Sequence, residues 1–215
     1  MIISLTGFMG CGKSSVGREL SKLLCCPFMD LDQVIEERIG RTIPEIFAKS
    51  GEAEFRRLEK ETLKEVLETA GRVLEIPKTP ALVTLGHPLA GGGMSSPSSS
   101  TPAGKTRQEI LSKNTPKRVV ALGGGAVMTP ECEEMVHGQT VCVYLRTSVD
   151  ELVARLSGEA AGRPLLNTTD LRDRILDLMS KRASTYERVA HLVIDTDGKT
   201  IDQVAYEIAE KVIYS

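Results

Sequence analysis

The stretch "GFMGCGKSS", residues 7–15, directly follows the apolar run "IISLT" at residues 2–6. It matches the pattern G-x-x-x-x-G-K-[ST], which Gly12, Lys13 and Ser14 complete, and apolar residues at helical spacing come after it. With average residue usage, a chance match in a chain of this length is on the order of one per cent. The stretch therefore predicts a strand, a phosphate-binding loop and a helix that bind a nucleoside triphosphate.

Each residue type in this loop has a physical task. Glycines let successive backbone N–H groups turn inward around phosphate oxygens, and the start of the following helix adds a partial positive charge. Lys13 supplies a point charge to the β- and γ-phosphates, and Ser14 offers a hydroxyl to Mg²⁺, the expected cofactor beside ATP. The residues expected to bind the nucleotide here are Gly10, Cys11, Gly12, Lys13, Ser14 and Ser15.

The composition is ordinary for a globular protein, with 41% apolar and 26% charged residues among 215 and a formal net charge of -2. A general nucleic-acid binder would carry a basic excess, so small-molecule partners are favoured. No stretch approaches the roughly 20 apolar residues that span a bilayer, and the start lacks the features of a secretory signal. We expect a cytoplasmic monomer without membrane contact. The five cysteines form no C-x-x-C pair and predict neither a disulfide framework nor a zinc site.

Five short apolar runs alternate with segments of helical periodicity. Because parallel neighbours need helical crossovers, this predicts a three-layer α/β fold with a five-stranded, mostly parallel sheet and helices on both faces. The expected strands are residues 2–6, 27–32, 117–122, 140–145 and 191–195. The expected helices begin near Lys13 and cover residues 33–40, 43–50, a longer stretch ending at Gly71, and residues 130–136, 148–156, 171–187 and 201–212. Ligands of such sheets bind at the carboxyl ends of the strands.

Residues 72–117 depart from this alternation. They include "IPKTPALVTLGHPLAGGGMSSPSSSTPAGKT", which is rich in Pro, Gly, Ser and Thr and has too few periodic apolar residues to make a core. We expect a single domain over residues 1–215, interrupted here by a low-complexity insertion whose anchor points lie near the substrate side. Residues 157–170, "SGEAAGRPLLNTTD", have the small and turn-forming residues of a mobile lid.

Two acidic residues, Asp30 and Asp32, stand two apart at the end of an expected strand, so their side chains leave it on one side. One carboxylate can hold the metal through water, and the other can face an acceptor hydroxyl. Asp32 can also be a helix cap, which does not exclude the other role. The N-K-x-D pattern of a switch GTPase is absent. The third strand ends in "GGG" where a motor ATPase usually carries an acidic pair, which indicates that this position binds something else.

Further pieces of the chain complete a pattern that resembles the shikimate kinase family, small P-loop kinases of the nucleoside-monophosphate-kinase structural group. The matching pieces, in the order of that family, are "GFMGCGKSSVG", "FMDLD", "SGEAEFRRLE", "VVALGGGAV", "RPLL" and "RASTYERVA". Together they cover nearly all of residues 1–71 and 118–215. The resemblance implies transfer of phosphate from ATP to the 3-hydroxyl of shikimate, giving shikimate 3-phosphate and ADP in chorismate and aromatic amino-acid biosynthesis.

The resemblance also implies roles for the acceptor-side residues. Arg56 and Arg182 would clamp the shikimate carboxylate, for which the planar, bidentate guanidinium is suited. Asp32 would face the ring hydroxyls, either as a general base or as a positioning group. The implied substrate-binding residues are Asp32, Arg56, Gly123, Gly124, Gly125 and Arg182. A triple glycine would let the backbone come close to the ring.

On the nucleotide side, the resemblance implies that Arg163 comes down on the phosphates from the lid and that Arg155 lies against adenine. Asp30 would bind the water shell of the metal, next to Ser14. The implied catalytic residues are Lys13, Asp32 and Arg163.

Two other functions stay open at this point. A gluconate-type or other small-metabolite kinase on the same fold would lack the paired arginines together with the triple glycine. A nucleotide-binding module, with the insertion as its interaction element, would bind ATP without turnover. Cys11 stands where the family usually has another small residue, and we expect the loop to tolerate it because its backbone does the binding.

Overall fold

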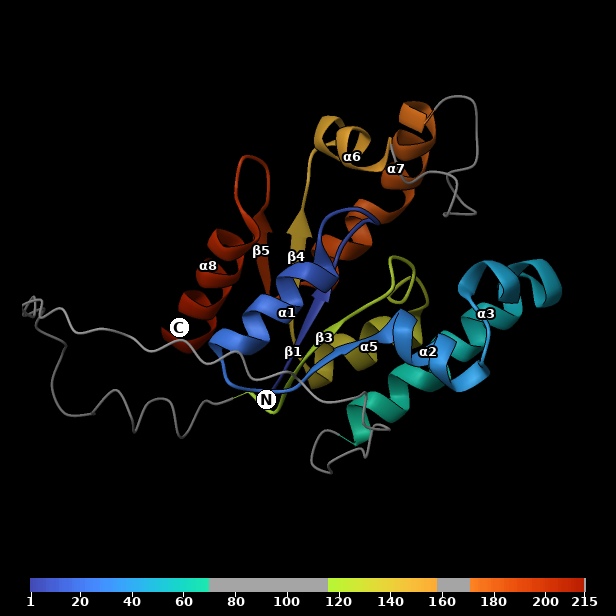
Figure 1. Ribbon diagram of the computed structural model, residues 1–215, viewed down its shortest axis with the longest axis horizontal. Helices are drawn as coiled ribbons and strands as arrows, with labels where there is room; N and C mark the ends of the chain where they lie inside the picture. Colours follow the sequence, from blue (N-terminus) through green and yellow to red (C-terminus); the bar gives the residue numbers. More distant parts are fainter. Residues whose placement is uncertain (70–115, 158–170, 215) are drawn as a thin grey trace, which may run out of the picture.

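The computed structural model describes residues 1–69, 116–157 and 171–214, which form a three-layer α/β fold (Figure 1). Five strands make one sheet in the order β2-β3-β1-β4-β5, and all neighbours in it are parallel. The predicted sheet is confirmed, with parallel pairing throughout. The strands are β1 (Ile2–Thr6), β2 (Phe28–Asp30), β3 (Arg118–Ala121), β4 (Val141–Arg146) and β5 (Leu192–Asp195). The helices are α1 (Lys13–Leu23), α2 (Leu31–Ile39), α3 (Ile43–Glu68), α5 (Pro130–Gln139), α6 (Val149–Leu156), α7 (Leu171–Val189) and α8 (Ile201–Tyr214).

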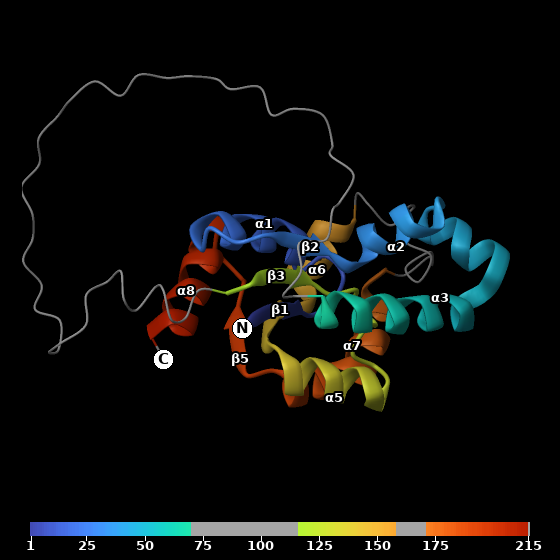
Figure 2. The same ribbon diagram turned by 90° about the horizontal axis from the view of Figure 1, so that it is seen from below.

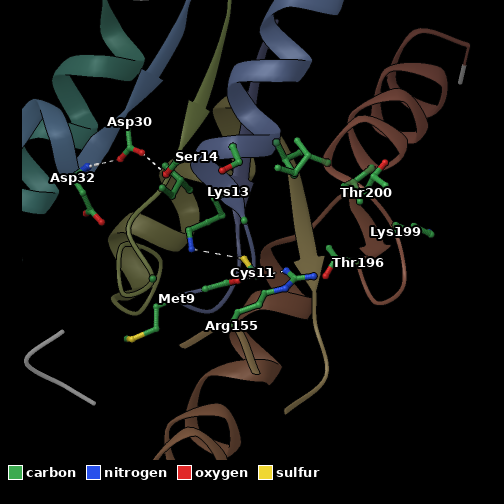
Figure 3. A pocket seen from close by; sticks show the side chains of 18 residues that line it. Met9, Cys11, Lys13, Ser14, Asp30, Asp32, Arg155, Thr196, Lys199 and Thr200 are labelled. Carbon is green, nitrogen blue, oxygen red and sulfur yellow. Dashed lines mark hydrogen bonds between the residues drawn. The ribbon is translucent and has the colours of Figure 1, made fainter. Parts of the chain in front are cut away.

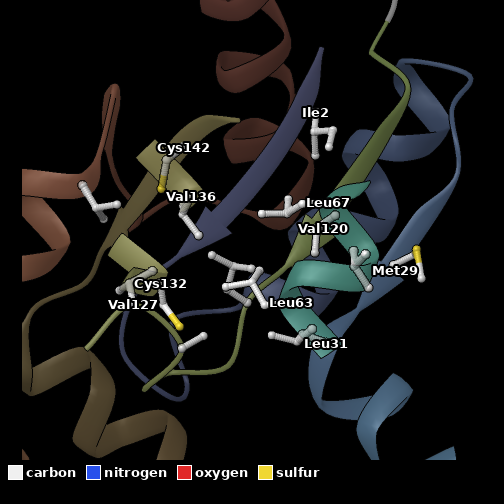
Figure 4. Packing of buried hydrophobic residues seen from close by; sticks show 14 of the residues in the cluster. Ile2, Met29, Leu31, Leu63, Leu67, Val120, Val127, Cys132, Val136 and Cys142 are labelled. Carbon is white, nitrogen blue, oxygen red and sulfur yellow. The ribbon is translucent and has the colours of Figure 1, made fainter. Parts of the chain in front are cut away.

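Strand side chains alternate between two apolar layers, as a sheet covered on both faces requires. On β4, Cys142 and Tyr144 enter the layer that α3 and α5 cover, whereas Val143 and Leu145 enter the layer of α1 and α8. Figure 2 shows α1 and α8 on one side of the sheet and α3 and α5 on the other. Leu63 of α3 lies in the first layer, among buried side chains from the strands and α5 (Figure 4). None of the described helices is long and apolar enough to cross a membrane.

Several helix ends follow the predicted capping chemistry. The Thr42 N–H donates to Glu45 Oε2 at 2.8 Å, and the Glu45 N–H donates to Thr42 Oγ1 at 3.4 Å, which completes the capping box of α3. The Glu151 N–H donates to Ser148 Oγ at 3.3 Å at the start of α6. Gly40 ends α2 with a positive φ of 66°.

Helix α2 begins earlier than the sequence predicted. Strand β2 ends at Asp30 and α2 begins at Leu31, so Asp32 lies in the first helical turn. The cap is Asp30, whose Oδ1 accepts the Asp32 N–H at 3.2 Å. The two carboxylates therefore do not leave one strand side by side, and the interpretation of Asp32 as a cap is wrong.

The two ends of the expected insertion lie together. At the start of β3, the Arg118 guanidinium donates to the backbone carbonyls of Val66 and Thr69, at 3.2 Å each, where α3 ends. This is the amino end of β3, whereas the phosphate loop lies at the carboxyl end of the neighbouring β1. The expectation that the anchor points lie near the substrate side is therefore wrong. The expected helix end at Gly71 and most of the insertion lie outside the described residues.

Candidate active site

The phosphate loop connects β1, the central strand, to α1 (Figure 3). Gly10 and Gly12 have φ values of 82° and 94°, a region that residues with a Cβ rarely adopt. A Cβ at Gly10 would also lie 2.9 Å from the Leu156 side chain, so the loop packs closely under α6. The geometry turns the first N–H groups of α1 toward the loop, which makes an anion site.

Backbone carbonyl groups of the loop hold the side chain of Lys13 in place. Its Nζ donates to the carbonyl oxygens of Gly7 and Phe8 at 3.0 Å each, and lies 3.8 Å from the Cys11 sulfur. The Cys11 side chain is buried in the apolar layer of α1 and α8. The ammonium is therefore placed where phosphate oxygens would enter the loop.

A cavity of about 770 Å³ opens above the loop and extends in two directions. One end reaches Asp32 and Gly124, at the carboxyl ends of β2 and β3. The other end reaches the turn after β5 and the start of α8. Its lining residues are Met9, Gly10, Cys11, Gly12, Lys13, Ser14, Ser15, Val16, Asp30, Asp32, Leu122, Gly124, Arg155, Thr196, Lys199, Thr200, Ile201 and Val204.

Ser14 and Asp30 meet at the floor of this cavity. The Ser14 hydroxyl donates to Asp30 Oδ2 at 2.5 Å, which places two hard oxygen ligands beside the loop. The described residues contain no group of three or more His, Cys, Asp or Glu side chains that would hold a metal by themselves. Mg²⁺ keeps most of its waters and binds substrate phosphates, so a hydroxyl and one carboxylate fit it.

Asp32 and Glu59 face the same glycine from two helices. A Cβ at Gly123 would lie 2.6 Å from Asp32 Oδ1 and 2.5 Å from Glu59 Oε1. Both oxygen atoms are buried and have no hydrogen-bond partner among the described residues. Burial raises the pKa of Asp32 to about 6, with the Asp30 charge adding to the rise and Lys13 opposing it. Burial likewise raises the pKa of Glu59 to about 7, although Arg56 acts against it.

Arg56 lies beside these acids on α3. Its Nη1 donates to Glu59 Oε2 at 2.6 Å and its Nη2 to Glu52 Oε1 at 3.1 Å. A Cβ at Gly125 would lie 2.5 Å from the guanidinium carbon of Arg56. The glycines at 123 and 125 therefore make room for protein side chains, a reason that the sequence did not predict.

Arg182 approaches the glycine loop from α7. It is 9% exposed, and its Nη1 donates to the Gly124 carbonyl oxygen at 3.4 Å. The hydroxyl of Tyr186 donates to the same oxygen, and its ring packs against Tyr144 of β4 at 5.3 Å between centroids. Arg56 and Arg182 both lower the pKa of Glu59, and both approach the glycine loop, Arg56 at Gly125 and Arg182 at the Gly124 carbonyl oxygen.

Arg155 also lines this cavity, at the end that reaches the turn after β5 (Figure 3). Its Nε donates to Glu151 at 2.9 Å, and its Nη1 reaches the Gly10 carbonyl oxygen at 3.5 Å. Figure 3 shows it between the phosphate loop and the turn that carries Thr196. Arg163 and nearly all of the expected lid, residues 158–170, lie outside the described residues.

The sequence interpretation missed two parts of this site. Glu59 stands three residues after Arg56, a spacing that places both on one face of a helix, but it was not singled out. The turn "DTDGKT", residues 195–200, follows the last strand, and its position at a carboxyl end could have predicted a ligand contact.

The chain is similar to known proteins of one family. The profile of the shikimate kinase family matches residues 9–76 and 105–213. A shikimate kinase of Thermus thermophilus is 34% identical over 97% of this chain and 88% of its own length, and one of Bordetella avium is 34% identical over 97% and 78%. Among solved structures, a shikimate kinase of Acinetobacter baumannii in complex with shikimate superposes with a TM-score of 0.74 at 28% identity, covering 99% of this chain and 93% of that one. A shikimate kinase of Bacteroides thetaiotaomicron gives a TM-score of 0.71 at 26% identity, covering 100% and 99%.

Proposed function

The chain belongs to the shikimate kinase family, and we propose on this premise how its residues phosphorylate shikimate. The reaction transfers the γ-phosphoryl group of ATP to the 3-hydroxyl of shikimate and gives shikimate 3-phosphate and ADP, a step of aromatic biosynthesis. The observation that carries the assignment of residues is the continuity of one cavity from the phosphate loop to Asp32 and Gly124. Phosphoryl transfer needs mainly alignment and charge neutralisation, which such a continuous site can supply.

The nucleotide end would bind ATP through the loop and α1. The loop backbone would hold the phosphates, and Lys13 would exchange its two carbonyl contacts for phosphate oxygens. Arg155 and the turn at residues 196–200 would lie on either side of the base, because they line the end of the cavity beyond the loop. The short bond between Ser14 and Asp30 supports a magnesium site there, with Asp30 acting through a water. A bound Mg²⁺ supplies charge neutralisation to the phosphates.

The acceptor end would bind shikimate between the glycine loop and the arginines. Arg56 and Arg182 would hold the carboxylate, and Asp32 would face the reacting hydroxyl with its buried, unpartnered Oδ1. The proton of that hydroxyl would go to Asp32 as the oxygen–phosphorus bond forms. Arg163 would act on the phosphates from the lid at residues 157–170, a role that rests on the sequence alone.

We also propose a cytoplasmic monomer with a single domain, interrupted at about residues 72–117. The adjacency of the two ends of the insertion at Arg118 supports one domain, since the chain leaves and re-enters the fold at one place. Sedimentation equilibrium of the full chain would test the oligomeric state.

The decisive experiment is a coupled ADP-release assay with shikimate, in parallel with quinate and gluconate. We expect turnover with shikimate and little with the other two acids. Turnover with gluconate alone would favour a different small-metabolite kinase. ATP binding without turnover on any acid would favour a nucleotide-binding module.

A further inference from the structure

Gly124 connects the phosphate loop to helix α7. Its backbone lies against the loop, since a Cβ at this position would be 3.5 Å from the Met9 backbone nitrogen and 3.8 Å from the Gly7 carbonyl oxygen. Helix α7 supplies two donors to the Gly124 carbonyl oxygen, Arg182 Nη1 at 3.4 Å and the Tyr186 hydroxyl. Because Gly124 also lines the cavity, a shift of this carbonyl group would change the shape of the acceptor end.

The two donors differ in how firmly they are held. Tyr186 is fully buried, and its ring packs on Tyr144 of β4 with 5.3 Å between the ring centroids. A phenol ring enclosed in this way cannot turn its hydroxyl elsewhere without opening the core. Arg182 stands one helical turn earlier on the same face of α7, and its distance of 3.4 Å is long for a hydrogen bond. Of the two donors, Arg182 is therefore the one that can leave the Gly124 carbonyl oxygen.

The packing that holds Tyr186 continues to the start of the phosphate loop. Tyr144 pairs in register with Thr6, the last residue of β1, and a Cβ at Gly7 would lie 3.5 Å from the Tyr144 ring. Burial also raises the pKa of the Tyr186 hydroxyl, which therefore keeps its proton at physiological pH. The Gly124 carbonyl oxygen thus has one donor whose position is fixed by the core and whose proton is always present.

The guanidinium of Arg182 has donors beyond the one that reaches Gly124. It carries five N–H groups in a planar fork, and the bond to the Gly124 carbonyl oxygen uses one of them. A carboxylate takes two of these groups in parallel, which fixes the direction of the whole guanidinium plane. The long bond to Gly124 would give way to such a pair. Under the proposed function, the carboxylate that binds there is that of shikimate.

We propose that Tyr186 is a positioning residue that holds the Gly124 carbonyl group while the substrate is bound and so releases Arg182 to bind the substrate carboxylate. The support of Gly124 by Tyr186 is independent of the substrate, whereas the release of Arg182 rests on the proposed function. Without the Tyr186 hydroxyl, Arg182 would have to serve both the carbonyl oxygen and the substrate. Binding of the carboxylate would then leave a buried acceptor without a donor.

The first test compares Tyr186→Phe with the wild type in steady-state kinetics. For shikimate, kcat/KM should fall roughly 5- to 100-fold, the range for leaving a buried acceptor unpaired, and the fall should come mainly from KM. The methyl ester of shikimate, which lacks the carboxylate charge, should lose much less, so the ratio of acid to ester turnover should fall. Tyr144→Phe is the matched control, because it removes a hydroxyl from the neighbouring buried ring and leaves both donors of Gly124 in place.

A double-mutant cycle separates this role from a general structural one. In an Arg182→Met background, the further change Tyr186→Phe should alter kcat/KM for shikimate less than about threefold, because no arginine remains to be released. A tyrosine that only stabilises the fold would instead reduce kcat/KM by the same factor in both backgrounds. Such equal factors would overturn the proposal, as would equal losses for the acid and the ester, or an equal loss in Tyr144→Phe.

A measurement on the unaltered chain decides the question even where a variant does not fold. With ¹³C-labelled tyrosine and ¹⁵N-labelled arginine, saturation with shikimate should move the Arg182 side-chain resonances and leave the Tyr186 Cζ resonance in place. Movement of Tyr186 with an unchanged Arg182 would contradict the proposal. If the wild type releases no ADP with shikimate, the proposed function is refuted. The ¹³C resonance of the Gly124 carbonyl in substrate-free Tyr186→Phe, compared with Tyr144→Phe, then still shows whether Tyr186 holds this group.

Discussion

Gly125 illustrates how one hydrogen atom in place of a side chain determines the position of a charged group. A Cβ at this position would lie 2.5 Å from the guanidinium carbon of Arg56, a separation that real Cβ atoms do not show. Arg56 is also held by Glu59 and Glu52, so it cannot withdraw without losing two ion pairs. The requirement for glycine here thus comes from the protein's own side chains.

Gly125→Ala should therefore displace Arg56 and reduce kcat/KM for shikimate roughly 10- to 100-fold, the scale for losing a hydrogen bond to a charged group. The Kd for ATP should stay within about twofold, because the nucleotide end of the cavity is untouched. Gly138→Ala on α5 is the control, since a Cβ there meets nothing within 4 Å. Equal kinetics in the two variants would show that Arg56 does not depend on this close approach.

A second prediction at the residue scale concerns Arg56 and Arg182, the two arginines that would hold the substrate carboxylate. Arg56→Lys and Arg182→Lys retain charge but lose the bidentate fork, so kcat/KM for shikimate should fall by roughly one to two decades while ATP affinity hardly changes. Arg57→Lys is the control, because Arg57 is exposed and pairs with Glu54 and Glu61. The methyl ester of shikimate, assayed with the wild type, should be a poor substrate. An ester that reacts as well as the acid would remove the carboxylate clamp.

At the scale of elements, the described residues on the two sides of the insertion lie close together. Arg118 bonds the last carbonyls of α3, and the Lys117 N–H donates to the Met1 carbonyl oxygen at 2.7 Å. Both ends are therefore fixed by contacts within the described fold, at the amino ends of β1 and β3, whereas the cavity lies at the carboxyl ends.

Deletion of residues 79–104 should leave a cooperative unfolding transition and most of the activity. The segment offers little apolar surface, and the residues left on both sides suffice to join ends that already lie together. Circular dichroism melting and ADP release of the deletion variant would test this. Loss of the transition, or a collapse of turnover, would show that the insertion is a working part of the fold.

Some of these elements could be predicted from the sequence, whereas one helix start and one site residue could not. Alternating apolar runs and capping residues such as Thr42 and Ser148 predicted the sheet and several helix starts, because these signals are local. The start of α2 was misplaced because Asp30 ends a strand of three residues and caps the next helix at once. Glu59 was missed because its significance depends on Asp32 and Gly123, which only the folded chain brings beside it.

At the scale of the whole molecule, the acid pair affects how stability depends on pH. Folding raises the pKa of Asp32 from 3.8 to about 6 and that of Glu59 from 4.5 to about 7, so the folded state binds more protons than the unfolded state between about pH 4 and 7. Stability from this source is fully present below the unfolded values and is lost as pH rises through the folded ones. His191 acts in the opposite direction, because burial and His137 hold its pKa below 6.5.

The free energy of unfolding should therefore be lower at pH 8 than at pH 5.5, by an amount on the order of 2–4 kcal/mol from the pair alone. Urea titrations at the two pH values would measure it, with the m-value showing whether the same surface unfolds. In Glu59→Gln most of this decline should vanish, since glutamine has no proton to lose, while Glu52→Gln, which changes an exposed partner of the same arginine, should keep it. A Glu59→Gln variant that declines as steeply as the wild type would show that Glu59 is not the source of the decline. A wild type that becomes more stable from pH 5.5 to 8 would contradict the raised pKa values and leave the buried pair charged in the folded protein already at the lower pH. The cost of two buried like charges would then have to be met by Arg56 and Lys13, and the acceptor end would have one cation fewer for the substrate carboxylate.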